Sequence, residues 1–542
     1  QSAVQAPVDE PLRAVAGKGA EARDKENETL VDVRLLDHAG KKAKATESKD
    51  NKRAELKTVL MSLGQAIDDS DRAAHFEAPA VNQFINTVDQ AFSTFSIDVD
   101  TASYTLCRNF LLRGHLPPPE AVRVEEFVNF FDYNYPAPEK DTFKVYTECA
   151  PSPFGRGLSL LKIGVKGQRL GREEQRPAVL TILMDTSGSM EQPDRLELAR
   201  QAVKMLIEKL APNDRVALIQ YDSHARIVLE STPAAEKQKI LDAVNGLQCN
   251  GSTNLEEGMD RAYQIALRNF TAGAENRVLI LSDGVANLGG TGADEILGKV
   301  EQARKQGVFC SVFGFGMGAY DDVMLETLAN KGNGTYAFID SDEEAKRVFV
   351  DDLAATLNTI AKDVKIQIEF NPSLVARYRQ VGYENRRLNK QDFRNDAVDA
   401  GEVGSGQSVT ALYEFENTVL PSGKAVQLPQ VPVATIRVRY QRVQDGRIEE
   451  IETRIMPQDL QRRSDQTSTG FKLAAATAEF AEILRGSPHA AGSEYADVAT
   501  LLRPVALDLK LDPRVQELLR LVDQAGSCSR AEPGTSTPVQ MK

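Results

Sequence analysis

The chain has 542 residues, of which 42% are hydrophobic and 26% charged, a composition typical of soluble globular proteins with several domains. Its 65 basic and 78 acidic side chains give a formal net charge of −13, which argues against a nucleic-acid-binding surface. No stretch reaches the roughly 20 apolar residues that a membrane-spanning helix needs. Five scattered cysteines and five histidines predict neither a disulfide scaffold nor a structural zinc site.

The N-terminal segment, residues 1–75, differs in composition from the rest. Between Glu21 and Leu60, 19 of 40 positions are Asp, Glu, Lys or Arg, and such a segment buries too little apolar area to offset its ordering entropy. We therefore expect a flexible charged tether. Because the first residue is Gln1 rather than Met, we also expect a processed or trimmed chain. A charged tether suits an exported, anchored protein, so we expect a location in the periplasm or at the outer membrane or cell surface, with a possible lipid anchor upstream.

The next region, residues 76–172, has globular composition. It begins with a short strand and an amphipathic helix in which Leu106, Phe110 and Leu111 share a face at helical spacing. Two segments of strand-like alternation follow, TFKVYTECAPSP and LSLLKIGVKG. We expect this region to flank the unit that comes after it.

Residues 173–362 alternate buried strands with helices. The apolar run 178–184 is too short to span a membrane and is typical of a strand buried on both faces. A helix at 195–210 and a hairpin of 215–221 with 225–229 follow. Further strands are expected at 277–282, 308–313 and 335–339, and further helices at 233–247, 254–268, 293–306, 321–331 and 342–361. Parallel neighbours need crossover helices, so this order predicts an α/β fold with a doubly wound, mostly parallel sheet.

The remaining chain returns to short alternating strands over residues 363–460, which predicts an antiparallel sandwich. Residues 461–526 contain helical patterns at about 470–485 and 493–524, and residues 527–542 form a polar tail. Because the alternating segments before and after the βα unit are alike, we expect 76–172 to pair with 363–460 as one discontinuous sandwich, into which the βα unit is inserted.

Polar side chains follow the predicted parallel strands at the edge where ligands bind in such sheets. Asp185, Ser187 and Ser189 follow the first buried strand, Asp283 follows a later one, and Thr253 lies in a loop that opens a helix. Two carboxylates and three hydroxyls are hard oxygen donors with few charges, which suit Mg²⁺.

This pattern, D-x-S-x-S in DTSGSM with Thr253 in GSTN and Asp283 in SDG, resembles the metal-ion-dependent adhesion site of von Willebrand factor type A domains. The flanking segments resemble a bacterial, lipoprotein-type family of such proteins. The resemblance implies that the hydroxyls of Ser187, Ser189 and Thr253 contact the metal, while Asp185 and Asp283 act directly or through water. It also implies Mg²⁺, or Mn²⁺ or Ca²⁺, with an open position for an acidic side chain of a protein partner.

We therefore expect a metal-dependent protein-binding protein of adhesion or scaffold type at the bacterial cell envelope, and no enzyme. Two alternatives remain open. One is an accessory subunit of an ATP-driven complex, as type A domains serve in metal chelatases. The other is a metal-assisted hydrolase, whose base would be Asp222, Asp283 or His224.

Weaker patterns favour structural roles. The segment from Gly284 resembles a Walker A loop, but Gly290 stands where the phosphate-binding lysine is required. The glycine-rich run 314–318 lacks the spacing of a dinucleotide loop, so we expect close packing there. Asp98 and Asp100 lie outside the parallel sheet, and we expect them to cap a turn.

Overall fold

The computed structural model describes residues 75–531, apart from 78–79, 193–194, 285–289, 318–319, 353–354, 356, 399, 419–429 and 461–462. The expected tether, residues 1–75, lies outside this part of the chain except for its last residue. Most of the expected polar tail also lies outside it.

A six-stranded sheet in the order β10-β9-β8-β5-β6-β7 fills the middle of the chain. Its strands are β5 (Ala178–Asp185), β6 (Arg215–Tyr221), β7 (Ala225–Pro233), β8 (Glu275–Ser282), β9 (Val308–Phe315) and β10 (Tyr336–Ile339). All neighbours are parallel except the hairpin of β6 and β7. Every residue of β5, β8 and β9 is buried, as their apolar runs predict. The predicted doubly wound sheet is therefore confirmed.

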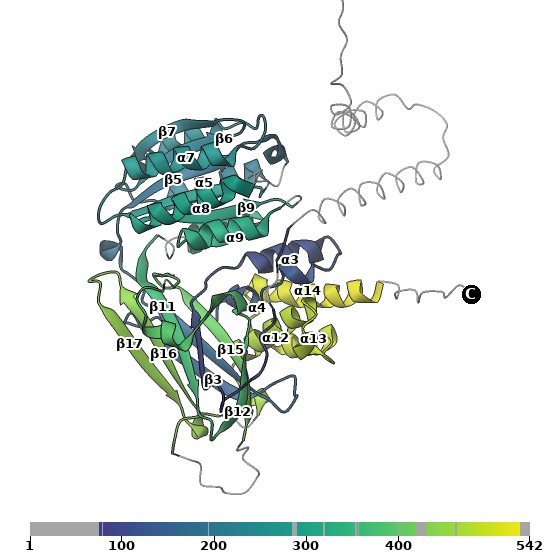
Figure 1. Ribbon diagram of the computed structural model, residues 1–542. Coiled ribbons are helices and arrows are strands. Elements are labelled where there is room, and N and C mark those ends of the chain that lie inside the picture. The colour runs from purple at the N-terminus through teal and green to yellow at the C-terminus, as the bar shows by residue number, and fades with distance from the viewer. Residues whose placement is uncertain are drawn as a thin grey trace, which may run out of the picture. The chain divides into compact units, whose positions relative to one another are not determined.

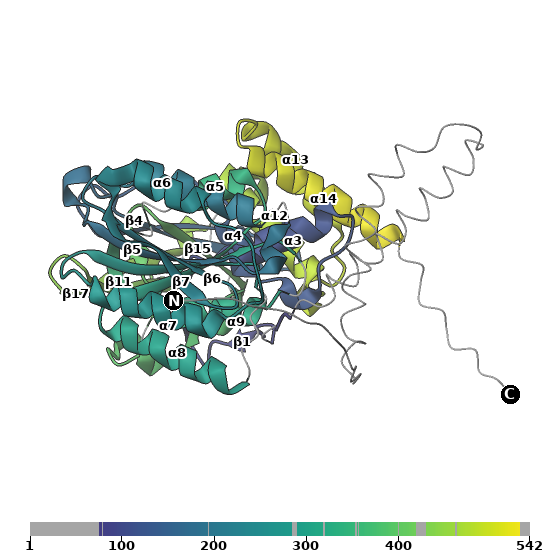
Figure 2. The same ribbon diagram turned by 90° about the horizontal axis from the view of Figure 1, so that it is seen from above.

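Helices cover both faces of this sheet (Figure 2). One face carries α5 (Leu196–Lys209) and α6 (Lys237–Asn245), whose apolar side chains share one core with the sheet. The other face carries α7 (Leu255–Arg268), α8 (Gly290–Lys305) and α9 (Asp322–Lys331), which share a second core. The carboxyl ends of β5 and β8 therefore lie between two helical layers, at the edge where the polar residues were expected.

The end of this domain differs from the expected single helix at 342–361. Helix α10 covers only Asp342–Lys346, a π-helical turn covers Arg347–Asp351, and strand β11 begins at Thr359. Residues 359–361 belong to this strand because Thr359 pairs with Gly404, and Ala361 pairs with Val403 and Arg442, in other strands of the sandwich.

Two antiparallel sheets make the sandwich, and both use strands from before and after the βα domain (Figure 1). One has the order β1-β12-β15-β4-β3 and the other β13-β2-β11-β16-β17, with β14 paired to β11. The strands before the βα domain are β1 (Ile85–Asn86), β2 (Phe92–Ser96), β3 (Phe143–Pro151) and β4 (Ser159–Gly167). Those after it are β11 (Thr359–Phe370), β12 (Val375–Val381), β13 (Arg387–Leu388), β14 (Val403–Gly404), β15 (Ser408–Asn417), β16 (Ala434–Arg442) and β17 (Ile448–Ile455).

The C-terminal region is a helical bundle of α12 (Thr469–Leu484), α13 (Tyr495–Asp508) and α14 (Pro513–Ala531), packed on α4 (Val124–Asn129). The expected single helix at 493–524 is wrong. Pro513 begins a new helix, and the Asp512 carboxylate accepts the backbone N–H of Arg514. Helix α14 also extends five residues into the expected tail, to Ala531. Within the described residues, no helix is both long and apolar enough to cross a membrane.

Helix α3 (Ala102–Leu112) joins the bundle to the βα domain, and it lies beside α14 (Figure 1). Leu106 and Phe110 pack in the core shared with α7, α8 and α9, whereas Leu111 packs in the core of the bundle. The single apolar face expected for these three residues is therefore wrong: the helix is buried on two sides.

Candidate metal centre

The carboxylate of Asp185, the last residue of β5, is fully buried and held by three donors. Its Oδ1 accepts the backbone N–H of Ser187 at 2.9 Å. Its Oδ2 accepts the hydroxyls of Tyr221 and Ser282, each at 2.9 Å, from the ends of β6 and β8. The three donors come from three separate segments at one edge of the sheet, so they fix the orientation of the carboxylate.

Burial, together with the nearby charge of Asp283, raises the pKa of the Asp185 carboxyl to about 6. The hydrogen bonds from Ser187 and Ser282 oppose this rise. A raised pKa means that the surroundings disfavour the charged form of the Asp185 carboxyl. A bound cation would stabilise that charged form.

Ser187 and Ser189 bring their hydroxyl oxygens to 3.1 Å from each other. Between them, the N–H of Gly188 donates to the carbonyl of Gly251 at 3.1 Å. A Cβ at Gly188 would lie 3.3 Å from that carbonyl oxygen, which explains the small residue in this turn. Ser187 is 1% exposed, whereas Ser189 is half-buried. This turn, residues 187–189, is the serine turn, and it presents two converging hydroxyls beside the buried Asp185.

Thr253 lies in a loop that backbone hydrogen bonds tie to the same edge. Asn250 donates its N–H to the carbonyl of Thr186, and Asn254 donates to the carbonyl of Asp222, each at 2.8 Å. The side chain of Asn254 also caps α7 by accepting the N–H of Glu257. Thr253 itself is half-buried, and its hydroxyl forms no hydrogen bond within the described part of the chain. Backbone hydrogen bonds thus join the loop of Thr253 to the serine turn, and the Thr253 hydroxyl is available to bind a ligand.

Asp283 follows β8 and is 2% exposed. Its Oδ2 accepts a hydrogen bond from Nη1 of Arg195 at 2.6 Å, and the same nitrogen donates to the carbonyl of Ser189 at 3.0 Å. Arg195 therefore joins Asp283 to the serine turn. In the sequence, Arg195 stands only at the start of the predicted helix 195–210. Nothing in the local pattern reveals its role, because its acidic partner lies 88 residues further along the chain.

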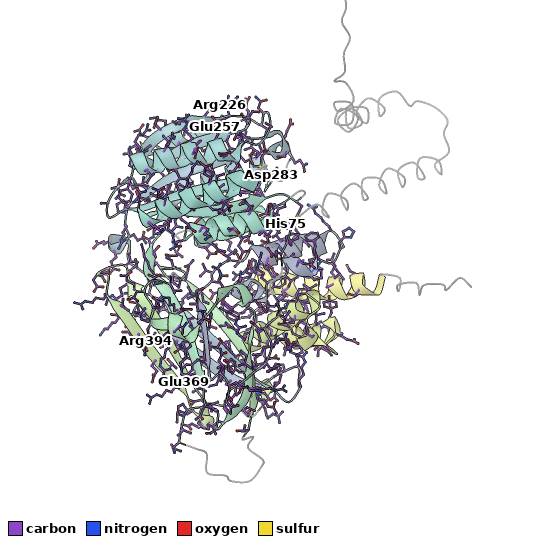
Figure 3. All side chains as sticks on the ribbon, in the orientation of Figure 1. His75, Arg226, Glu257, Asp283, Glu369 and Arg394 are labelled. Atoms are coloured by element: carbon purple, nitrogen blue, oxygen red, sulfur yellow. The ribbon has the colours of Figure 1, made fainter. Side chains whose placement is uncertain are left out.

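Asp283, Glu257 and Arg226 all lie on the type A domain (Figure 3). The side chain of His224 is 80% exposed, and its Nδ1 lies 3.5 Å from a carboxylate oxygen of Glu257. Asp222 accepts the N–H of His224 and pairs with Arg226. Cys249 is half-buried, and burial raises the pKa of its thiol. Residues 285–289 of the neighbouring loop lie outside the described part.

The donor set fits a hard divalent cation. Neighbouring oxygens around an octahedral Mg²⁺ at about 2.1 Å lie about 3 Å apart, and the two serine oxygens lie 3.1 Å apart. Within the described ranges, no group of three or more His, Cys, Asp and Glu side chains could hold a metal ion. A cation at this edge would therefore depend on the hydroxyls of Ser187, Ser189 and Thr253, beside Asp185 and Asp283.

Two of the weaker sequence patterns have structural roles, one in packing and one in hydrogen bonding. A Cβ at Gly314 would lie 1.8 Å from the hydroxyl of Tyr320, so this glycine makes room for the tyrosine. Asp98 accepts the N–H of Asp100, as expected for a turn, and also pairs with Arg386 at 2.9 Å.

Comparison with known proteins agrees with this architecture. The profile of the von Willebrand factor type A domain matches residues 180–353, and a profile described as von Willebrand factor matches 70–162. A third, described as Uncharacterized protein YfbK, C-terminal, matches 355–528. The chain is therefore a von Willebrand factor type A domain protein, as the resemblance at Asp185, Ser187 and Ser189 implied.

The chain is 36% identical over 421 residues to Uncharacterized protein YfbK of Escherichia coli strain K12, covering 73% of this chain and 72% of that protein. It belongs to the YfbK family. It is also 29% identical over 289 residues to Uncharacterized protein sll0103 of Synechocystis, covering 52% of this chain and 65% of that protein. Among solved structures, von Willebrand factor type A from Catenulispora acidiphila matches 72% of this chain and 91% of that chain, at 17% identity and a TM-score of 0.42.

Proposed function

We propose that this protein binds a partner protein through a divalent cation, in an adhesion or scaffold role. The observation that carries the proposal is the pair of hydroxyls of Ser187 and Ser189, 3.1 Å apart beside the buried Asp185 carboxylate. With Thr253 and Asp283, these residues would hold Mg²⁺, or Mn²⁺ or Ca²⁺. The ion would supply an electrophilic position for an anionic oxygen of the partner.

The expected ligand is a Glu or Asp side chain, because an anionic oxygen displaces metal-bound water more readily than a neutral one does. Affinity would come from one strong contact at the centre of a modest interface, surrounded by the loops that carry His224 and Thr253. Removal of the metal would then weaken binding more than the loss of any one residue at the periphery.

The test compares partner recovery from an envelope extract with Mg²⁺ and with EDTA. The variants are Thr253→Ala and, as a matched control, Ser252→Ala, which removes the neighbouring hydroxyl that contacts Ser223. We expect recovery with Mg²⁺ from the wild type and from Ser252→Ala, and its loss with EDTA or in Thr253→Ala. Equal recovery under all conditions would contradict a metal-bridged mechanism and move recognition to the sandwich.

We also propose that the protein acts at the bacterial cell envelope, exported and tethered through its charged N-terminal segment. The support is the composition of that segment, with 19 charged positions out of 40 between Glu21 and Leu60. Fractionation of cells that express the protein from its native gene tests this proposal. Recovery only in the cytosolic fraction would contradict it and would favour the accessory-subunit alternative.

The hydrolase alternative gains no support from the candidate bases. Asp222 pairs with Arg226, and Asp283 pairs with Arg195. His224 is exposed beside Glu257. Each of these groups is already engaged or turned to the surface, and none of the three matching family profiles is described as an enzyme family.

A further inference from the structure

We infer that Arg195 sets the charge of the metal centre: it holds the affinity for the cation down and makes an anionic group the preferred partner ligand. This inference rests on the proposed function and assigns a positioning role to a residue outside the five-residue motif. Its basis is the buried contact of Arg195 with Asp283 and with the serine turn.

The side chain of Arg195 is buried, and contacts with three loops hold it in position. The residue is 5% exposed, and its Nη2 donates to the carbonyl of Met317 at 2.6 Å, while Nη1 reaches Ser189 and Asp283. One guanidinium therefore joins the loops that follow β5, β8 and β9.

The glycine-rich end of β9 makes room for this side chain. Gly316 has φ +69°, and a Cβ there would lie 2.5 Å from the Nε and 2.6 Å from the Cγ of Arg195. Any larger residue would push the guanidinium away and would also strain the backbone. The run of glycines noticed in the sequence thus serves Arg195 as well as Tyr320.

The Nε of Arg195 is buried without a hydrogen-bond partner in the described part of the chain. Leaving a buried donor unsatisfied carries a cost, against which stand the hydrogen bonds of Nη1 and Nη2 to Ser189, Asp283 and Met317. The charge of the guanidinium lies directly against the buried carboxylate of Asp283, at 2.6 Å, which indicates an electrostatic role.

The consequence follows from the charges. Asp185 and Asp283 are two carboxylates, and Arg195 reduces their net charge to one negative, so a divalent cation leaves one net positive charge. Without Arg195 the loaded centre would be neutral. A less negative site binds the cation more weakly, and a positive loaded site binds an anion more strongly.

The test distinguishes this charge effect from a structural role, because loss of the charge should raise the affinity for the cation and lower the affinity for an anion. Calorimetry measures Mn²⁺ binding to the full chain, and then glutarate binding to the Mn²⁺-saturated protein as a probe for an acidic side chain. In Arg195→Gln we expect Mn²⁺ affinity to rise about tenfold and glutarate affinity to fall several-fold, given Coulomb energies near a protein surface. Arg195→Lys, which keeps the charge, should stay within about threefold of the wild type in both measurements.

Thermal melts establish that each variant is folded, and Arg195→Met repeats the experiment with an apolar neutral side chain. Weaker binding of both Mn²⁺ and glutarate in the neutral variants would overturn the inference, because a distorted loop would explain it. Failure of both neutral variants to fold, with Arg195→Lys folded, would also overturn it. A wild type that binds no Mn²⁺ would instead refute the proposed function itself.

Discussion

Polar side chains are arranged differently at two places in the molecule. One is the junction of the type A domain with its flanking regions, and the other is the carboxyl edge of the type A sheet. At the junction, Arg123 donates to the buried carboxylates of Asp322 of α9 at 2.7 Å and Glu126 of α4 at 3.4 Å, and it pairs with the half-buried Glu326 at 2.6 Å. At the carboxyl edge, the serine hydroxyls contact each other, and the hydroxyl of Thr253 has no partner within the described residues.

The junction continues as a network of buried ion pairs. Arg386 contacts Asp98 at 2.9 Å and the side chain of Asn330 at 2.7 Å, and it so links the sandwich to α9. Between the sandwich and the bundle, Arg379 of β12 bridges Glu414 of β15 and Glu482 of α12. Charged groups at the junction pair across separate elements, whereas at the carboxyl edge the hydroxyls of Ser187, Ser189 and Thr253 make few contacts, as the proposed metal centre requires.

Arg123→Met should cause the largest loss of stability, because it leaves the buried carboxylates of Asp322 and Glu126 without their cation. We expect the free energy of unfolding to fall by about 3–5 kcal/mol, measured by urea denaturation. The control is Arg394→Met at an exposed pair with Glu450 (Figure 3), where the arginine side chain is 69% exposed. An effect as small as that of the control would contradict the structural role of the junction.

Local sequence patterns predicted the parts of the fold that depend on neighbours in the chain. The apolar run 178–184 gave the strand that ends at Asp185, and the D-x-S-x-S spacing placed Ser187 and Ser189 in one turn. Arg195 could not be assigned, because the carbonyl of Met317 that it contacts lies 122 residues away.

The same limit explains the boundary errors. Residues 359–361 were expected in a helix, but pairing of β11 with β14, and of Ala361 with β16, extends the strand to Thr359. Such pairing joins residues far apart in sequence, which helical periodicity does not report. The turn that separates α13 from α14 was missed although Pro513 marks it.

Mg²⁺ or Mn²⁺ should stabilise the wild type by about 2.7 kcal/mol at a concentration one hundred times the dissociation constant, since the ion binds only the folded state. Asp185→Ala should remain folded and lose this response, and thermal melting with and without the ion measures it. Asp260→Ala on α7, at an exposed pair with Lys299 of α8, is the matched control and should keep the full response. An unchanged response in Asp185→Ala would place the ion elsewhere.

Stability should depend on pH through Glu402, at the junction. Burial raises the pKa of its carboxyl to about 7, against the opposing hydrogen bond from Asn333 and the charges of Lys362 and Arg277. Because the folded pKa exceeds the unfolded value, the folded state binds the proton more tightly. The resulting stabilisation is present at low pH and is lost as the pH rises through about 7.

Glu402→Gln should therefore remove part of the decline in unfolding free energy between about pH 5 and pH 8, on the order of 2 kcal/mol. Urea titrations of wild type and variant at several pH values measure the difference. Parallel pH profiles would show that Glu402 ionises in the folded state as it does in the unfolded chain.

The most direct test of the metal centre is anomalous diffraction from crystals of the full chain soaked with Mn²⁺. We expect a peak within about 2.0–2.3 Å of the hydroxyl oxygens of Ser187 and Ser189, and no peak there in crystals of Asp185→Ala. A Mn²⁺ peak at another site, with these hydroxyls still bonded to each other, would contradict the assignment of the metal centre.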